Sequence, residues 1–193
     1  MIKYIAKEDV QNYPLIEFKG NIHLVNNLSD LVKACDIISK YNIVGFDTET
    51  KPAFKKGVSY RISLIQLSVD DDVFVFQIDQ TGLDQKIIDI LSDANTLKVG
   101  IDVKNDLIGL KKIKYFTESH FLDLNTLAIH KGFKSIGAVK LCIMFLGFRI
   151  SKRQRLSDWS AAVLTEAQLE YAAIDAWICP LIFNGFKENL LYP

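Results

Sequence analysis

The sequence has 193 residues, 49% of them hydrophobic and 24% charged, which fits one globular domain and excludes a disordered chain. The 23 basic residues balance the 23 acidic ones, so the overall basic excess of many nucleic-acid-binding domains is absent, although a local basic rim stays compatible with this balance. The three cysteines are widely spaced in apolar sequence without a Cys-x-x-Cys pair, which indicates buried thiols and argues against a zinc site. No signal peptide and no run of transmembrane length is evident, so we expect a cytoplasmic protein with no membrane partner.

Residues 1–21 differ in pattern from the rest of the chain. They mix charge with isolated apolar residues and contain Pro14 and Gly20, which favours an extended lead-in. We therefore expect one domain at 22–193, and no repeat or low-complexity linker divides it.

The first half of the domain is predicted to be rich in strands. In chain order we expect a strand at 22–25, a helix at 29–41 capped by Ser29, and strands at 43–50, 61–69 and 73–78. The last three strands follow one another with short connections, which favours an antiparallel meander.

The second half alternates strands and helices. We expect a helix at 84–91, a buried strand at 96–101 running parallel to the strand at 43–50, a helix at 103–112, a strand at 120–122, and helices at 123–131, 135–146 and 165–190. This order predicts an α/β fold with a mixed sheet and helices on both faces.

The strand at 43–50 carries two acids, Asp47 and Glu49. Because side chains alternate faces along a strand, the two carboxylates point the same way, about 7 Å apart along the strand. Two like charges this close favour a bound cation, and Mg2+ or Mn2+ suits oxygen ligands. The alternative is a solvated strand end with both acids facing water.

A further acid, Asp106, follows the predicted strand at 96–101. Ligands gather at the carboxyl ends of strands in open α/β sheets, so this position suits a site, and Asp102 competes for the same role. Alternatively, either acid stabilises the first turn of the helix that follows.

The last predicted helix begins with a capping-box pattern at 165–168 and carries Tyr171 and Asp175. These two residues are four apart and therefore lie on one helical face. The alternative is a core tyrosine and a surface acid.

Taken together, Asp47, Glu49, Asp106 and Asp175 offer four carboxylates from three elements. Such a set can hold two divalent cations roughly 4 Å apart, the arrangement used for in-line displacement at phosphorus. Water then serves as the nucleophile, and the hydroxyl of Tyr171 can orient it.

With these motifs in order, the sequence resembles the DEDD-type 3′-5′ exonucleases of the tyrosine subclass, in the group of the Werner syndrome exonuclease domain and ribonuclease D. The resemblance covers about residues 22–190. It rests on Phe46-Asp47-Thr48-Glu49 with Pro52, on Leu64-Ile65-Gln66-Leu67-Ser68, on Gly100 with Asp106-Leu107 and Leu110, on Ser157-Asp158-Trp159-Ser160 with Leu164-Thr165, and on Tyr171-Ala172-Ala173-Ile174-Asp175-Ala176.

The resemblance implies an RNase H-like mixed sheet of five strands, an antiparallel meander plus parallel strands, flanked by helices on both faces. It implies that Asp47, Glu49 and Asp175 hold one Mg2+ or Mn2+ ion and that Asp47 and Asp106 hold a second. Tyr171 would orient the attacking water, and the product would be a 5′-mononucleotide of DNA or RNA. Glu170 stands where the histidine subclass has its base, and Asp102 departs from the pattern because relatives often have a small residue there.

The implied substrate is single-stranded or 3′-ended nucleic acid, with room for a helicase or repair partner in trans. Substrate contacts are expected from Phe54 by stacking on a base and from basic residues facing phosphates: Lys55, Lys56, Arg61, Lys152, Arg153 and Arg155. The alternative for each basic residue is a solvated surface position.

Two other functions stay open at this point. One is a weakly active or inactive nucleic-acid-binding module that keeps the fold. The other is a phosphodiesterase for short oligonucleotides, which shares the chemistry and differs in the depth of its pocket.

Overall fold

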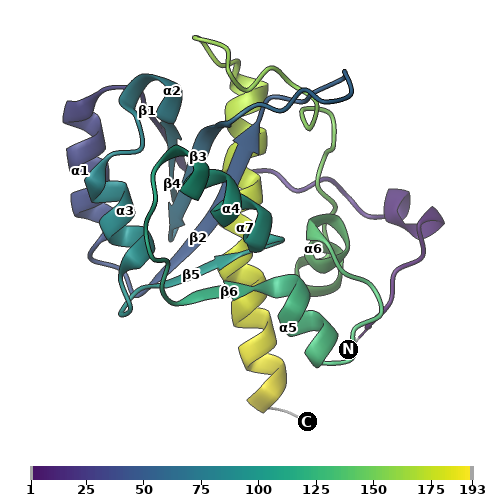
Figure 1. The fold of residues 1–193 in the computed structure, drawn as a ribbon. Coiled ribbons are helices and arrows are strands. Elements are labelled where there is room, and N and C mark those ends of the chain that lie inside the picture. The colour runs from purple at the N-terminus through teal and green to yellow at the C-terminus, as the bar shows by residue number, and fades with distance from the viewer. Residues whose placement is uncertain (1, 192–193) are drawn as a thin grey trace.

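A six-stranded mixed sheet forms the centre of the computed structural model, which describes residues 2–191 (Figure 1). Its strands are β1 (Asn21–Val25), β2 (Ile43–Thr50), β3 (Ile62–Val69), β4 (Asp72–Gln77), β5 (Leu97–Gly100) and β6 (Phe121–Asp123), in the spatial order β1-β4-β3-β2-β5-β6. The predicted antiparallel meander of β2, β3 and β4 is confirmed, as is the parallel pairing of β5 with β2. The sheet has the six strands expected in chain order rather than the five that the family resemblance implied, because both short outer strands pair in parallel with their neighbours.

The helices follow the predicted order with two additions. They are the 3-10 helix η1 (Glu8–Asn12), α1 (Leu28–Ile38), α2 (Ile78–Thr81), α3 (Gln85–Ser92), α4 (Val103–Ile113), α5 (Leu124–His130), α6 (Ala138–Leu146) and α7 (Glu166–Leu191). The sequence analysis missed η1 and α2, which are single turns too short to show a period.

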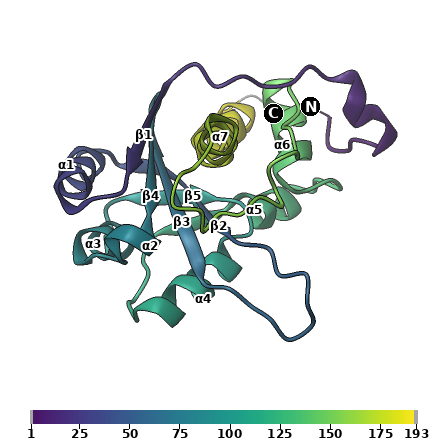
Figure 2. The same ribbon diagram turned by 90° about the horizontal axis from the view of Figure 1, so that it is seen from above.

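Helices cover both faces of the sheet (Figure 2). α1, α3 and α4 pack on one face, where the cluster of buried residues includes Phe46, Ile65 and Leu110. α7 crosses the other face, and its small residues Ala172 and Ala173 pack in one cluster with β3 and β4. The expected arrangement of helices on both faces is confirmed.

Two helix starts test the expected caps. At α7, the Thr165 N–H donates to Gln168 Oε1 at 3.0 Å and the Gln168 N–H donates to Thr165 Oγ1 at 3.2 Å, so the capping box is confirmed. At α1 the expected cap was wrong. Asn27 has the extended backbone of an N-cap and accepts from the Asp30 N–H, because the helix begins one residue before Ser29.

The lead-in lies against the domain. Ile5 and Ile16 are buried, and Leu15 forms an isolated bridge with Arg149. Within residues 2–191, no helix combines the length and the apolar character needed to cross a membrane.

Gly45 lets α7 approach β2 closely. A Cβ atom at this position would lie 2.1 Å from Ser68 Oγ, 2.2 Å from the Ala176 carbonyl oxygen and 2.9 Å from Pro180 Cδ. The Ser68 hydroxyl donates to that same carbonyl at 3.1 Å. Because two of the three atoms belong to α7, the separation between the helix and β2 depends on the missing side chain.

We predict that Gly45→Ala lowers the free energy of unfolding by about 2–3 kcal/mol, since overpacking of a close contact moves backbone. Gly109→Ala is the matched control. A Cβ at Gly109 meets only the side chain of Ile62, and alanine also favours the helix, so the change in stability there should be small. Chemical denaturation of both variants measures the difference, and equal effects would contradict this account of the packing.

Candidate active site

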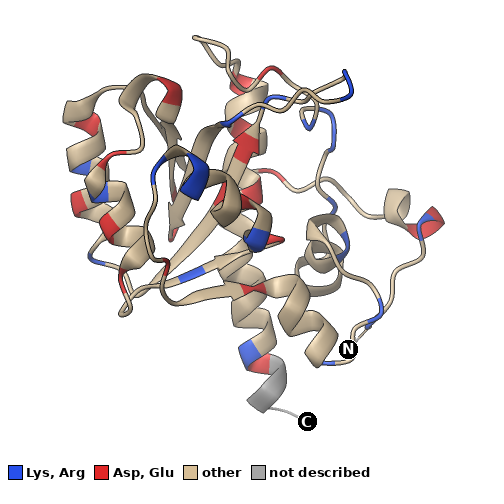
Figure 3. Ribbon diagram, in the orientation of Figure 1, with Lys and Arg blue, Asp and Glu red and all other residues tan. Residues whose placement is uncertain are grey.

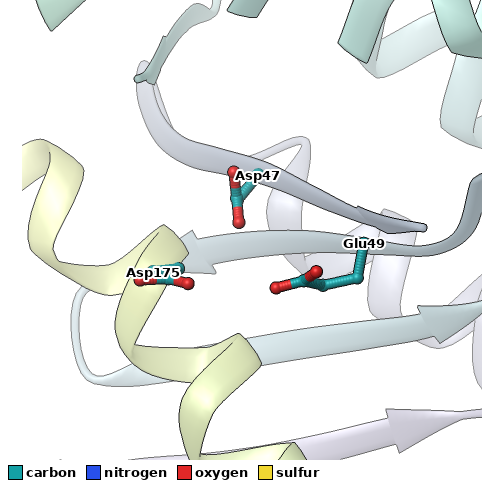
Figure 4. A group of neighbouring side chains, drawn as sticks. All are labelled: Asp47, Glu49 and Asp175. Atoms are coloured by element: carbon teal, nitrogen blue, oxygen red, sulfur yellow. The ribbon is translucent and has the colours of Figure 1, made fainter. Parts of the chain in front are cut away.

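Three carboxylates from two elements meet above the carboxyl-terminal half of β2 (Figure 4). One carboxylate oxygen from each of Asp47, Glu49 and Asp175 lies within 4.8 Å of the others. β2 supplies the first two because residues at spacing two share a strand face, and α7 supplies the third. The expected side-by-side placement of Asp47 and Glu49 is confirmed.

Burial and mutual repulsion shape the electrostatics of this cluster. The pKa of Asp47 is raised well above its ordinary value by burial and by the charges of Asp175, Asp106 and Glu49. Burial and the charges of Asp175 and Asp106 raise the pKa of Glu49 to about 9. Burial raises the pKa of Asp175 to about 7. The charges acting on Asp47 are therefore all of its own sign.

This donor set fits a hard divalent cation. Carboxylate oxygens are the ligands that Mg2+ and Mn2+ prefer, and a cation within the cluster would offset the repulsion that raises these pKa values. The three residues named by the geometry are those that the family resemblance implied for one metal ion.

Asp106 lies in the first turn of α4, outside this group of three. Its carboxylate accepts a hydrogen bond from Thr48 Oγ1, and Thr48 points to the opposite face of β2 from Asp47. Its charge nevertheless contributes to the raised pKa values of Asp47 and Glu49. The four expected carboxylates are thus neighbours, with Asp106 approaching from the α4 side.

Two more acids lie near Asp106. Burial, and then the charges of Asp102 and Asp123, raise the pKa of Asp106 to about 7. Asp102 has a left-handed backbone with φ 64° and makes no cap hydrogen bond. Asp123 Oδ2 instead accepts from the Val103 N–H at 2.9 Å, which stabilises the start of α4. The sequence analysis missed Asp123, although it ends a parallel strand in the position that drew attention to Asp106.

Tyr171 sits one turn before Asp175 on α7, as its spacing predicts. A hydrogen bond links the two side chains, and burial raises the pKa of the Tyr171 hydroxyl above its ordinary value. The hydroxyl therefore stays neutral and acts as a donor. The ring of buried Trp159 lies 5.8 Å from the tyrosine ring, centroid to centroid, and restricts its position.

A cavity of about 300 Å3, called here the catalytic cavity, opens over the cluster. Asp47, Tyr171 and Asp175 line it on one side. Three basic residues also line it, Lys140, Lys152 and Arg155, of which the sequence analysis expected the last two. Lys140 was missed because it belongs to α6, which is distant in sequence from every motif.

The other expected substrate contacts are spread over the surface. Phe54 and Lys55 line a second cavity of about 360 Å3, and Lys56 and Arg153 are exposed and line neither. Arg61 is bound to Asp79, with NH2 at 2.7 Å and Nε at 2.8 Å from Oδ1, so its charge is already paired. Figure 3 shows basic residues on the loops beside the upper part of α7 and acidic residues on β2 and α7 between them.

Comparison with known proteins places this site in a family. The sequence model described as 3′-5′ exonuclease matches residues 22–191. The chain belongs to the 3′-5′ exonuclease family. The expected family is therefore confirmed, and the carboxylate cluster lies in an enzyme family that hydrolyses nucleic acid and uses divalent metals.

Curated relatives of this 3′-5′ exonuclease domain come from plants, bacteria and animals. A 3′-5′ exonuclease of Arabidopsis thaliana is 30% identical over 92% of this chain and 67% of its own length. Ribonuclease D of Gluconacetobacter diazotrophicus is 30% identical over 86% of this chain and 42% of its own length. The mouse bifunctional 3′-5′ exonuclease/ATP-dependent helicase WRN is 30% identical over 90% of this chain, which spans only 13% of that protein.

The fold agrees with solved structures. The Aedes aegypti Nibbler EXO domain has a TM-score of 0.81 at 21% identity, and the match covers 92% of this chain and 93% of that one. At this identity the likeness shows the fold, which is the expected RNase H-like exonuclease fold.

The raised pKa values predict how stability depends on pH. The pKa of Glu49 rises from 4.5 to about 9 on folding, so the metal-free protein holds a proton that the unfolded chain gives up. The free energy of unfolding should therefore fall as pH rises from about 4.5 towards 9. Added Mg2+ or Mn2+ should raise the melting temperature more at pH 8 than at pH 5.

Thermal melts across this pH range, with metal or with EDTA, measure the effect. Asp47→Asn should flatten the pH dependence, whereas Glu8→Gln, an exposed acid in η1, should not. A metal-induced shift of the same size at both pH values would contradict the assignment.

Proposed function

We propose that this exonuclease removes 5′-mononucleotides from the 3′ end of single-stranded or recessed DNA or RNA, with water as the nucleophile and two divalent cations, Mg2+ or Mn2+. The observation that carries the proposal is the three-carboxylate cluster, because two of its members, Asp47 and Asp175, line a cavity together with three basic residues. Action in the cytoplasm, and a helicase or repair partner in trans, stay predictions.

Each acid has a distinct task in this reaction. Asp47, Glu49 and Asp175 would hold one cation, and Asp106 would help to hold the second from the α4 side. When bound, such cations lower the pKa of water and stabilise negative charge on the phosphoryl group and the leaving oxygen. The crowding of the carboxylates supports this role, because isolated acids would not need the charge compensation.

Tyr171 and the basic rim supply the remaining functions. The neutral Tyr171 hydroxyl donates to the Asp175 carboxylate, which fixes the hydroxyl, and its oxygen can accept a hydrogen bond from the attacking water. Lys140, Lys152 and Arg155 face the cavity and would neutralise the phosphates of the bound strand. Their charge places the polymer so that its terminal phosphodiester lies over the carboxylates.

Two solved neighbours bear on the choice of substrate. Trypanosoma brucei RNase D was solved in complex with RNA U12 and has a TM-score of 0.78 to this chain at 21% identity. Brucella melitensis NrnC was solved bound to pGG, with a TM-score of 0.73 at 24% identity. At these identities both likenesses show the fold alone, and the short-oligonucleotide phosphodiesterase is kept only as an outcome of the test below. The inactive binding module is not favoured, because the acids and Tyr171 are present and assembled.

A gel time course on 5′-labelled DNA and RNA of 2 to 20 nucleotides tests the proposal, with Mg2+, Mn2+ or EDTA. We expect a metal-dependent ladder that shortens from the 3′ end. Asp47→Ala should lower the rate by about a thousandfold, because it removes a ligand of the cation site. Tyr171→Phe should cost about 10–100-fold, since it removes only the hydroxyl.

Asp9→Ala, an exposed acid of the lead-in, is the control and should keep full activity. Cleavage restricted to the shortest substrates would establish the alternative function. Full activity of Asp47→Ala would show that the site assignment is wrong.

A further inference from the structure

The second cavity lies next to the catalytic cavity and is lined by side chains that suit an unpaired nucleobase. Its volume of about 360 Å3 is within the range of small-ligand sites, roughly 300–1,000 Å3. The loop at 51–60 contributes Lys51, Phe54 and Tyr60, and the segment before α7 contributes Leu156 and Asp158.

The apolar lining of this cavity is unusually exposed. The exposed fraction is 80% for Phe54, 48% for Tyr60 and 59% for Leu156. Aromatic side chains at the surface, interleaved with lysines, are the usual platform for single-stranded nucleic acid, because every base has a face that can stack. Lys55 at the same cavity supplies positive charge for a phosphate.

An ion pair holds the two walls together. Lys51 Nζ donates to Asp158 Oδ2 at 2.6 Å and lies 5.7 Å from the centroid of the Tyr60 ring. The contact links the loop at 51–60 to the segment before α7, so an ion pair connects the two segments that line the cavity.

The linings of the two cavities adjoin each other along the chain. Lys51 follows Glu49 by two residues, and Leu156 follows Arg155, which lines the catalytic cavity. A strand that leaves the catalytic cavity between these two chain segments would cross the second cavity.

We infer that the second cavity binds an unpaired base on the 5′ side of the scissile phosphate, stacked on Phe54 and Tyr60. The inference rests on the proposed exonuclease function. It identifies the second cavity as a place where the enzyme binds the nucleic-acid strand outside the cleavage site. The ligand class is a flexible single strand, since a paired base could not leave its stack to enter.

Abasic scanning tests the inference. Oligonucleotides with one abasic residue at the penultimate, third or fourth position from the 3′ end are compared with the intact oligonucleotide in single-turnover cleavage of the terminal nucleotide. In the wild-type protein, one abasic position should slow cleavage by about 5–100-fold, as expected for loss of one stacked base. With Phe54→Ala or Tyr60→Ala, the intact substrate should already be slow, and the same abasic position should cost nothing more.

Tyr60→Phe keeps the ring, so the abasic position that slows wild type should still slow this variant. Tyr115→Ala is the matched control, an aromatic residue that is 81% exposed on another part of the surface, and it should leave the abasic pattern unchanged. The same abasic penalties in wild type and in both alanine variants would overturn the inference. Absence of cleavage of the intact oligonucleotide by wild type would instead overturn the proposed function.

A second, independent observation concerns Gln66 in β3. The residue is fully buried, and neither its Nε2 nor its Oε1 atom has a hydrogen-bond partner among residues 2–191. Buried polar groups are nearly always paired, so an orphaned amide needs an explanation.

Strand register places Gln66 beside the cluster. It lies directly opposite Asp47 of β2 on one side and Val75 of β4 on the other. Opposite residues of an antiparallel pair share a face, with Cβ atoms about 5 Å apart. Gln66 and Asp47 therefore lie together on the face that α7 covers.

We propose that Gln66 is a positioning residue whose amide Nε2 donates to the ionised carboxylate of Asp47 when a divalent cation is bound. A charged acceptor makes the stronger kind of hydrogen bond, and partners of this type orient carboxylates that ligate metals. In the metal-loaded protein the buried amide would thus have a hydrogen-bond partner.

Gln66→Met tests this proposal, since methionine keeps the unbranched shape and removes the amide. The melting temperature of the metal-free variant should equal or exceed that of wild type, because no hydrogen bond is lost. The midpoint of a Mn2+ titration, followed by the melting temperature, should rise by about 10–100-fold. Gln66→Leu should give the same pair of results.

Gln168→Met is the matched control. This buried glutamine bonds to Thr165 and donates to the Asp158 carbonyl, so its loss should lower the metal-free melting temperature and leave the Mn2+ midpoint unchanged. A Gln66 variant that behaves like this control would overturn the proposal.

Discussion

Repulsion among half-buried carboxylates is the constraint to which the rest of the site responds. Asp47, Glu49 and Asp175 bring oxygens within 4.8 Å of one another, at a place where burial already disfavours their charges. Without other contacts to hold them together, the strand and the helix that carry these acids would move apart. Here β2 places two of the acids on one face by its alternation, and the close approach of α7 to β2 at Gly45 brings the third beside them.

That closeness comes from small residues and from one polar contact. Gly45 removes the side chain that would strike the Ala176 carbonyl, and the Ser68 hydroxyl donates to the same carbonyl. Alanines at 172 and 173 let α7 lie on the sheet where larger residues would lift it. The position of Asp175 therefore depends on residues that do not line the catalytic cavity, and the packing is part of the active site.

The sequence predicts where a side chain points when the repeat of its own strand or helix determines this. It does not predict placements that depend on contacts between elements distant in the chain. The spacing of two in β2 and of four in α7 was enough to pair Asp47 with Glu49 and Tyr171 with Asp175. No period reveals that Asp106 approaches from the α4 side through Thr48, or that Arg61 is already bound to Asp79. The orphaned amide of Gln66 was equally invisible, because its strand pattern shows burial but not the neighbours that satisfy a polar group.

The balance of charges in the chain has a structural explanation. Basic residues, including Lys140, Lys152 and Arg155, line the cavity, whereas the acids gather at its base. In the proposed state with two divalent cations, four positive charges offset the four carboxylates of Asp47, Glu49, Asp106 and Asp175. The basic residues of the lining would then attract a phosphate without competing repulsion from the carboxylates. A net charge of zero is therefore compatible with binding a polyanion, because bound cations would neutralise the acids and the strand would then meet a basic field.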